Sequence, residues 1–331
     1  MGEGMRKQKM KKILSLLVAG ALLLIGMSGC GTEAETGKAQ VAFVVKSTNS
    51  AFWKSVFAGA RAAATEYNLN VTFNGPESEE DYETQNEMVR QAMEEGVDVI
   101  VFSAVDYNAN AEIIGQAAQR GIKIVVIDSD VNSSMVSCRI GTNNLQAGVK
   151  AAEAALAVEE DELYIGIVNY DVNSANGQQR ELGFRQTVEQ DPRVKDITTI
   201  NVLSTTEDAR AGAKEMLLSD SRINVVVTFN EWTSLGVGWA IRDLDRRDRT
   251  QVVAFDSNVI SVGMLETGEV DALIVQNPYA MGYLGVETAA NLINGQTGGP
   301  SVIDTATTIV TRENMYERES QKILFSFEER K

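Results

Sequence analysis

The sequence predicts an α/β protein with two open, mostly parallel sheets. Short apolar runs rich in β-branched residues alternate with longer amphipathic stretches, and runs that are apolar throughout are typical of parallel strands covered on both faces. The 331 residues are about twice the usual length of a domain. About nine such runs precede a last one near the C-terminus, and the alternation breaks near residues 132–144. A single barrel would have eight strands, so two sheets fit better.

The expected strands follow each other at regular intervals along the chain. They cover residues 41–45, 71–73, 97–102, 122–127, 164–168, 198–202, 223–229, 251–255, 271–275 and 307–310. Between them, a period of 3.6 predicts helices, for example at 51–66, 82–94, 109–120 and 144–158. Ser50 is suited to cap the first helix, and Gly96, Gly121 and Gly268 stand where helices should end.

The first 29 residues have the pattern of an export signal. Five basic residues precede an apolar run at 13–27, which is short for a membrane span. Small residues then lead to Cys30, and this resembles the bacterial lipobox, in which the cysteine is acylated and becomes the first residue. We therefore expect a signal peptide at 1–29, lipid on Cys30 and a polar tether at 30–38. A true transmembrane anchor is the alternative.

Composition and charge exclude several kinds of activity. The chain has a net charge of -16, and removal of residues 1–29 takes away one acid (46 to 45) and five bases (30 to 25), which leaves -20. Such an acidic chain is unsuited to nucleic acid. The absence of histidine excludes a histidine-based triad and the commonest zinc sites. No glycine-rich nucleotide loop or calcium loop occurs, so no cofactor and no metal are expected. Cys138 is expected to be a small strand residue.

Polar residues gather directly after the expected strands, where the carboxyl ends of parallel strands form a ligand edge. The relevant segments are KSTNSAFW at 46–53, VIDSD at 126–130, NGQQRELGF at 176–184, TFNE at 228–231, AFD at 254–256 and VQNP at 275–278. Their order and spacing resemble the type I periplasmic sugar-binding proteins, the ribose-binding branch in particular, over residues 40–311. The resemblance implies two lobes joined by three crossovers, with the ligand held between them as in a Venus flytrap.

The resemblance also implies domain bounds and a set of ligand-binding residues. We expect one lobe at 39–142 plus 277–303, a second at 143–276 plus 304–311, and an extension at 312–331 that packs on a lobe or contacts a partner. The polar binding residues would be Asp128, Arg180, Asn230, Asp256 and Gln276, with Phe52 and Trp53 as a stacking wall. At the position of Lys46, ribose binders of the family have a small polar residue. A lysine at this position instead resembles the autoinducer- and deoxysugar-binding relatives.

These residue types suit a carbohydrate on chemical grounds. Carboxylates such as Asp128 and Asp256 accept from adjacent hydroxyls, Arg180 and Asn230 donate, and aromatic faces cover the C–H faces of a sugar ring. Lys46 and Arg180 balance the two aspartates, which favours a neutral ligand. The alternatives are that the acids are loop residues or helix caps and that the two cations face solvent. Since neighbouring helical residues cannot share a face, at least one of Phe52 and Trp53 should look outward or into the cleft. Trp232 and Trp239 are expected to pack.

The sequence therefore predicts an extracytoplasmic solute-binding lipoprotein without enzymatic activity, anchored by lipid at the outer face of the cell membrane or periplasmic. We expect a monomer that captures a neutral monosaccharide or similar polyol and delivers it to the permease subunits of an ABC importer. One alternative is a sensory receptor for an autoinducer or sugar that feeds a chemotaxis or kinase system. The other is a barrel glycosidase that uses two of the strand-end carboxylates.

Overall fold

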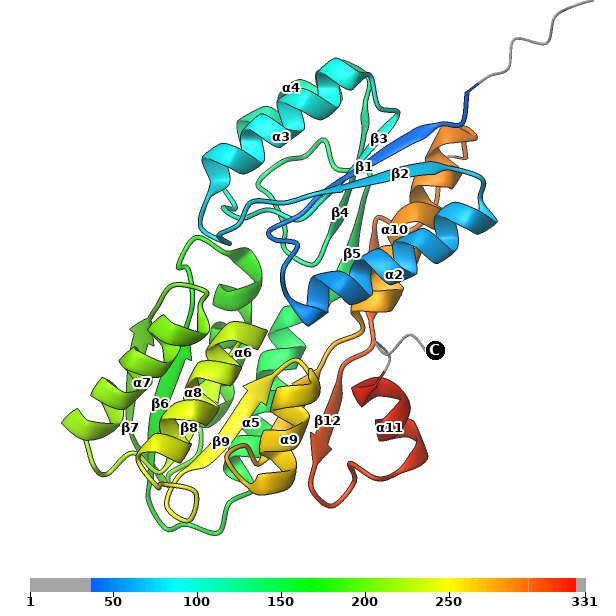
Figure 1. Ribbon diagram of the computed structural model, residues 1–331. Coiled ribbons are helices and arrows are strands. Elements are labelled where there is room, and N and C mark those ends of the chain that lie inside the picture. Colours follow the sequence, from blue (N-terminus) through cyan, green and yellow to red (C-terminus); the bar gives the residue numbers. More distant parts are fainter. Residues whose placement is uncertain (1–36, 297, 326–331) are drawn as a thin grey trace, which may run out of the picture. The chain divides into compact units, whose positions relative to one another are not determined.

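The computed structural model describes residues 37–296 and 298–325, and the part from Ala39 onward forms one compact unit. The predicted signal peptide and Cys30 lie outside the described residues. Two sheets of six strands each, with helices on both faces, make up this unit (Figure 1). The predicted fold class is confirmed, and the single barrel is wrong.

The first lobe is built on a parallel sheet with the order β11-β5-β4-β3-β1-β2. Its strands are β1 (Gln40–Val44), β2 (Asn70–Asn74), β3 (Val99–Phe102), β4 (Lys123–Ile127), β5 (Cys138–Thr142) and β11 (Val302–Thr305). Two apolar clusters cover its two faces. One includes residues of α2 (Ala51–Glu66) and α10 (Pro278–Ile293), and the other includes residues of α3 (Tyr82–Glu95) and α4 (Ala111–Gln119).

The second lobe repeats this plan with the order β12-β10-β9-β8-β6-β7, in which β12 alone runs antiparallel to its neighbour. Its strands are β6 (Leu163–Asn169), β7 (Val194–Asn201), β8 (Val225–Thr228), β9 (Gln251–Phe255), β10 (Ala272–Val275) and β12 (Thr308–Thr311). Its helices are α5 (Asn144–Leu156), α6 (Ala175–Val188), α7 (Thr206–Ser219), α8 (Glu231–Asp243) and α9 (Val259–Thr267). The core again consists of one apolar cluster on each face.

Within the described residues the chain passes between the sheets three times, after β5, after β10 and after β11. The predicted lobe boundary after residue 303 falls inside β11, because Thr305 still pairs with Thr142 in the first sheet. β5 and β11 are not among the expected strands, although Cys138, the first residue of β5, was expected to lie in a strand. The segment of β5, CRIGT, has arginine and glycine between its buried residues, and β11 lies at a sheet edge with only Thr305 buried.

The predicted helix ends are found in the structure. The Ser50 side chain accepts from the Trp53 amide at the start of α2, and Gly96 and Gly268 end α3 and α9 in left-handed conformation. Cys138 is a buried residue of β5, as expected. No helix of the described part of the chain has the length and apolarity that crossing a membrane requires.

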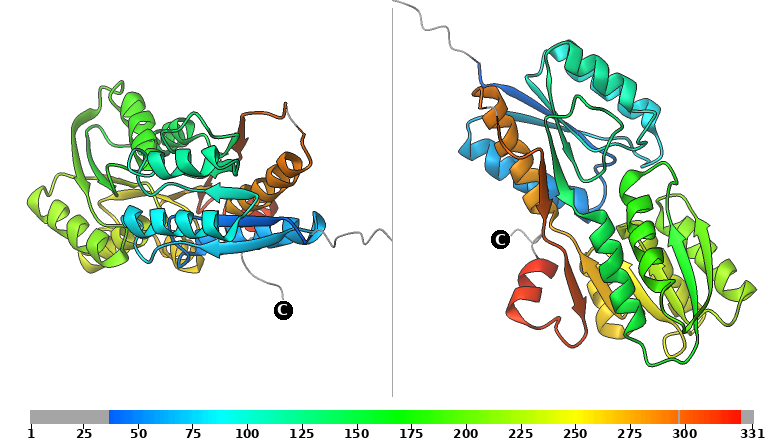
Figure 2. Two further views of the ribbon diagram at one scale, coloured as in Figure 1. Left: turned by 90° about the horizontal axis from the view of Figure 1, so that it is seen from above. Right: turned by 180° about the vertical axis from the view of Figure 1, so that it is seen from behind.

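The described part of the extension, residues 312–325, packs on the second lobe. Its helix α11 (Arg318–Leu324) lies beside β12 in Figure 1 and in the right view of Figure 2, and Met315 and Leu324 are buried in the same cluster as Val310 and Leu265. Of the two expectations for this segment, packing on a lobe is therefore confirmed.

Glycines let two helix pairs approach closely, one pair in each lobe. A Cβ atom added at Gly59 or Gly282 would lie 2.0 or 1.8 Å from a backbone oxygen of the partner helix in the pair α2 and α10. The pair α5 and α6 repeats this arrangement, since a Cβ at Gly148 would lie 2.1 Å from the Arg180 carbonyl oxygen. This second contact fixes the backbone of the helix that carries Arg180.

We predict that Gly282→Ala lowers the free energy of unfolding by at least about 1–3 kcal/mol, because the helices must separate to admit the methyl group. The matched control is Gly263→Ala in α9, where an added Cβ meets no atom within 4 Å. Alanine there should be neutral or stabilise by up to about 1 kcal/mol through helix propensity. Urea unfolding of both variants measures the difference. Equal stabilities of the two variants would contradict the close approach of α2 and α10.

Candidate functional site

The carboxyl ends of the strands of both lobes meet around one pocket. Lys46 follows β1, Asp128 follows β4, Asn230 follows β8 and Asp256 follows β9. The residues that line the pocket are Lys46, Ser50, Phe52, Trp53, Glu79, Asp128, Tyr170, Asn176, Arg180, Asn230, Glu231, Trp232, Asp256 and Gln276. All eight residues predicted from the sequence are thus brought together. The free space between them is only about 30 Å³, which is about the volume of one water molecule in the liquid.

Asp128 and Asp256 occupy equivalent positions in the two lobes. Both have left-handed backbone conformations, with φ of 58° and 67°, and each amide donates to a carbonyl of the neighbouring strand, Ile140 or Ile274, at 3.0 Å. Strained conformations of this kind persist where the surrounding structure enforces them, often at functional sites. The Asp128 carboxylate accepts from Ser103 Oγ at 3.1 Å and Asn176 Nδ2 at 3.0 Å. Neither aspartate caps a helix, so the helix-cap alternative does not apply to them.

Arg180 is the buried cation of the pocket, with 1% of its side chain exposed. Its Nε donates to Asn144 Oδ1 at 2.8 Å, its Nη1 to the Phe229 carbonyl at 2.6 Å and its Nη2 to Gln276 Oε1 at 2.8 Å. Asp128 Oδ1 lies 3.9 Å from Nη2. A guanidinium has five N–H donors, so donors remain for a ligand. The alternative of a solvated ion pair on α6 is wrong, because the side chain points into the interior.

Asn230 and Gln276 line the pocket, but their side chains are largely engaged inside the protein. Asn230 Oδ1 accepts from the Thr233 amide as the N-cap of α8, and its Nδ2 donates to Ser204 Oγ. Gln276 Oε1 accepts from Thr142 Oγ1 and from Arg180, and its Nε2 donates to Asp256 Oδ1 at 2.7 Å. Gln276 therefore joins the ends of two crossover strands to the charged residues of the pocket.

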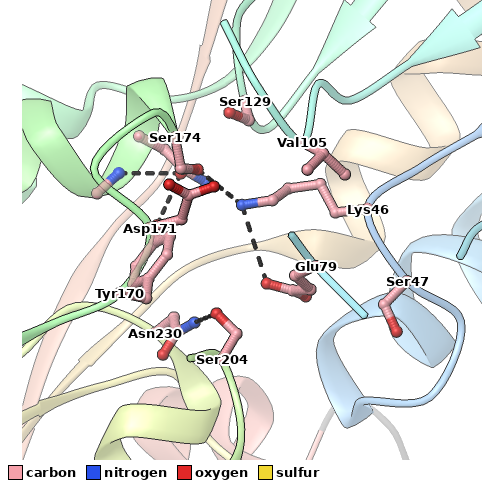
Figure 3. A network of polar contacts seen from close by, with 12 residues as sticks. Lys46, Ser47, Glu79, Val105, Ser129, Tyr170, Asp171, Ser174, Ser204 and Asn230 are labelled. Carbon is pink, nitrogen blue, oxygen red and sulfur yellow. Dashed lines mark hydrogen bonds and ion pairs between the residues drawn. The ribbon is translucent and has the colours of Figure 1, made fainter. Parts of the chain in front are cut away.

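Lys46 reaches from the first lobe to the second (Figure 3). Its Nζ donates to Ser174 Oγ at 2.7 Å, lies 3.8 Å from Glu79 Oε2 and stands 5.0 Å from the centre of the Tyr170 ring. The side chain is 2% exposed, so the alternative of a solvent-facing lysine is wrong.

The expectation that at least one of Phe52 and Trp53 looks outward or into the cleft is confirmed, because both line the pocket. Neither looks outward: both are buried, both line the pocket and both belong to the core cluster of the first lobe. Their rings meet edge to face with centroids 5.0 Å apart. This is possible because they lie at the start of α2, where the second lobe covers the helix end that would otherwise face solvent. Glu231 of α8 accepts there from the Ala51 and Phe52 amides at 3.3 and 3.1 Å.

Six further lining residues were not predicted as ligand contacts: Ser50, Glu79, Tyr170, Asn176, Glu231 and Trp232. Trp232 lines the pocket, and Trp239 packs on the core of the second lobe, as expected. Position after a strand could have indicated Tyr170, and Asn176 and Glu231 belong to segments singled out above. Glu79 belongs to an acidic run after β2, and no sequence pattern distinguishes it from the other acids of that run.

The two added glutamates change the charge of the pocket. Among its described lining residues are four acids, Glu79, Asp128, Glu231 and Asp256, and two bases, Lys46 and Arg180, so the formal charge is 2 - 4 = -2. The predicted balance of charges is wrong. Burial raises the pKa of Asp256 to about 7, against the opposing effects of Arg180 and Gln276, and burial also raises the pKa of Glu79. A pKa of about 7 leaves Asp256 partly protonated near neutral pH and ionised above it.

We predict that Asp256 makes the stability of the wild type depend on pH. Its pKa is about 3.9 in the unfolded chain and about 7 in the folded protein. The folded state therefore holds a proton that the unfolded state has lost, and this contribution is complete below pH 4 and disappears as the pH rises to 7. Relative to Asp256→Asn, the wild type should lose up to about 4 kcal/mol between pH 4 and 7. Asparagine also tolerates the left-handed backbone.

Urea unfolding of the ligand-free wild type and of Asp256→Asn at several pH values measures this difference. Parallel stability curves for the two proteins between pH 4 and 7 would contradict the raised pKa.

Two other features of the described residues do not compete with this pocket. No group of acidic or cysteine side chains there could hold a metal ion. A larger hollow of about 600 Å³ lies in the second lobe, where Gln251 and Ala272 begin β9 and β10. Ligand sites of open α/β sheets form at the carboxyl ends of the strands, not at these amino ends.

Two open sheets with converging strand ends and a pocket lined from both lobes define a two-lobed binding protein. The sequence model of the periplasmic binding protein domain family matches residues 41–297. The D-ribose/D-allose-binding protein of Pseudomonas aeruginosa is 26% identical over 321 residues, which is 91% of this chain and 99% of that relative.

Solved structures agree with the family match. A carbohydrate transporter solute-binding protein from Agrobacterium radiobacter, in complex with D-arabinose, has a TM-score of 0.84 and 26% identity over 87% of this chain and 99% of its own. An ABC transporter solute-binding protein from Agrobacterium vitis with bound D-fucose has a TM-score of 0.83 and 26% identity, with 87% and 100% covered. The chain belongs to the periplasmic binding protein family. The family consists of binding proteins, so this chain is not an enzyme and the glycosidase alternative is wrong.

Proposed function

We propose that this protein is an extracytoplasmic solute-binding lipoprotein that captures a neutral monosaccharide and delivers it to an ABC importer. The observation that carries the proposal is the single pocket to which both lobes contribute fixed carboxylates, a buried guanidinium and aromatic rings. Charged groups held in this way form hydrogen bonds of about 1.5–3 kcal/mol each with hydroxyls. The pentose, hexose or deoxysugar named for the relatives belongs to this chemical class.

The charge of the pocket supports a neutral ligand over an acidic one. The excess of carboxylates repels uronates and sugar phosphates, and a buried like-charged pair is costly. The excess of carboxylates in the pocket therefore favours a neutral ligand, as the balanced charges expected from the sequence would have done.

Capture requires the lobes to separate and close again. Pockets for small molecules usually measure about 300–1,000 Å³, so a sugar does not fit into the observed 30 Å³ until the lobes part. In the closed arrangement they are joined by bonds of Lys46 to Ser174, Asn176 to Asp128, and Glu231 to the start of α2. A ligand that touches both lobes would favour closure, and the permease would recognise the closed surface.

We predict that a panel of neutral monosaccharides contains at least one that raises the melting temperature of the chain starting at residue 30. At a hundred times its dissociation constant a ligand adds about 2.7 kcal/mol of stability, which corresponds to several degrees. Uronates and sugar phosphates should give no shift. A shift with amino acids or anions only would refute the proposed ligand class.

For the sugar that binds best, Asp128→Asn should weaken binding by about 10- to 100-fold, because a charge-assisted acceptor is lost. Asparagine keeps the left-handed backbone accessible. The matched control is Asp130→Asn in the same loop, whose carboxylate faces Arg139 at 2.8 Å and does not line the pocket. Calorimetry on both variants measures the change. Equal affinities of the two variants would argue against ligand contact by Asp128.

The lipid anchor is a separate part of the proposal, and it rests on the basic, apolar and small-residue pattern that ends at Cys30. We predict that the full chain is found in the membrane fraction of a bacterial host. The variant Cys30→Ser should carry no lipid, whether or not its signal peptide is removed. Mass spectrometry of the N-terminal peptide is the measurement. An unmodified Cys30 in a membrane-bound wild type would contradict lipidation. We further propose that the protein acts as a monomer.

A further inference from the structure

Glu79 lines the pocket, but no role in ligand binding has yet been assigned to it. It lies in the loop between β2 and α3 of the first lobe, its side chain is 11% exposed, and it lines the pocket together with Lys46 and Trp53. Figure 3 shows its carboxylate pointing to the Lys46 ammonium.

The two carboxylate oxygens of Glu79 have different surroundings. Oε1 accepts from Trp53 Nε1 at 3.1 Å, while Oε2 faces Lys46 Nζ at 3.8 Å, which is beyond hydrogen-bond distance. A carboxylate has about four acceptor sites. Oε2 therefore retains acceptor capacity for a ligand hydroxyl beside the Lys46 ammonium.

The neighbouring residue Glu80 points to the other lobe. Its Oε1 accepts from the Ser204 amide at 2.7 Å, and the Ser204 hydroxyl accepts from Asn230 Nδ2 at 3.1 Å. The loop that carries Glu79 is thereby attached to the second lobe in the closed arrangement. The two adjacent carboxylates thus have different contacts: Glu79 lines the pocket, and Glu80 bonds to the second lobe.

We propose that Glu79 is a specificity-determining residue, whose Oε2 accepts a hydroxyl of the bound sugar and whose negative charge excludes ligands with a carboxylate or phosphate. The inference rests on the proposed function and goes beyond it, because it assigns the discrimination between neutral and anionic sugars to one side chain. Of the four acids in the pocket, Asp128 is next to Arg180, Asp256 is bonded to Gln276, and Glu231 accepts from backbone amides of α2.

The test compares Glu79→Gln with Glu80→Gln, two identical changes at adjacent positions of one loop. Calorimetry at pH 8, chosen because burial raises the pKa of Glu79, measures binding of the neutral sugar that binds the wild type best and of D-glucuronate and D-galacturonate. For Glu79→Gln we expect a loss of at least tenfold for the neutral sugar. The ratio of uronate to neutral-sugar affinity should rise at least tenfold. Glu80→Gln should leave this ratio unchanged, since its side chain does not line the pocket.

Several results would overturn the proposal, and they are distinguishable from failure of the proposed function. A glutamine at position 79 can still accept from the Trp53 indole, so a purely structural role of Glu79 predicts an unchanged ratio and refutes the proposal. Equal changes of the ratio in both variants would also refute it, because general electrostatics would then be the cause. If the wild type binds no monosaccharide, the proposed function itself falls and this inference falls with it.

Discussion

The buried guanidinium of Arg180 is the constraint on which the rest of the site depends. An arginine side chain stays charged, and its burial is tolerated only with well-placed partners. These partners are the first residue of α5, the residue after β8 and the residue after β10. Three separate elements must therefore arrive at one point. The close glycine contact between α5 and α6 brings the Arg180 backbone to this point.

The two lobes contribute equivalent acids to this arrangement. Asp128 and Asp256 follow comparable strands, share a left-handed backbone and donate from their amides to the neighbouring strand in the same way. Gln276 connects the acid of the second lobe to Arg180 and to Thr142 at the end of β5. Since Thr142 and Gln276 lie where the chain crosses between lobes, a change in the charged pocket is coupled to the crossover segments.

Sequence patterns predicted much of the fold and the site, because continuous apolar runs fix parallel strands and strand ends fix where polar residues meet. Lys46, Asp128 and Asp256 could be found in this way, whereas Arg180, which lies within α6, was expected from the family resemblance of its segment. Edge strands such as β11 bury too little to leave a pattern. Glu79 could not be distinguished within its acidic run, because only the packing of the loop against Trp53 selects it. The charge of the pocket depends on such residues and was therefore mispredicted.

The contact of Glu231 with the start of α2 also depended on tertiary structure. A carboxylate at a helix start is ordinarily expected from the same chain segment, whereas here it comes from a helix of the other lobe, about 180 residues further along the chain. This contact also explains why Phe52 and Trp53 are both buried.

The most direct test of the central claim is a crystal structure of the protein with the neutral monosaccharide that binds it best. The account requires the sugar to lie between the lobes, with hydroxyls bonded to Asp128 from the first lobe and Asp256 from the second, and with Arg180 donating to the same molecule. A sugar bound elsewhere, or one held by a single lobe, would contradict it.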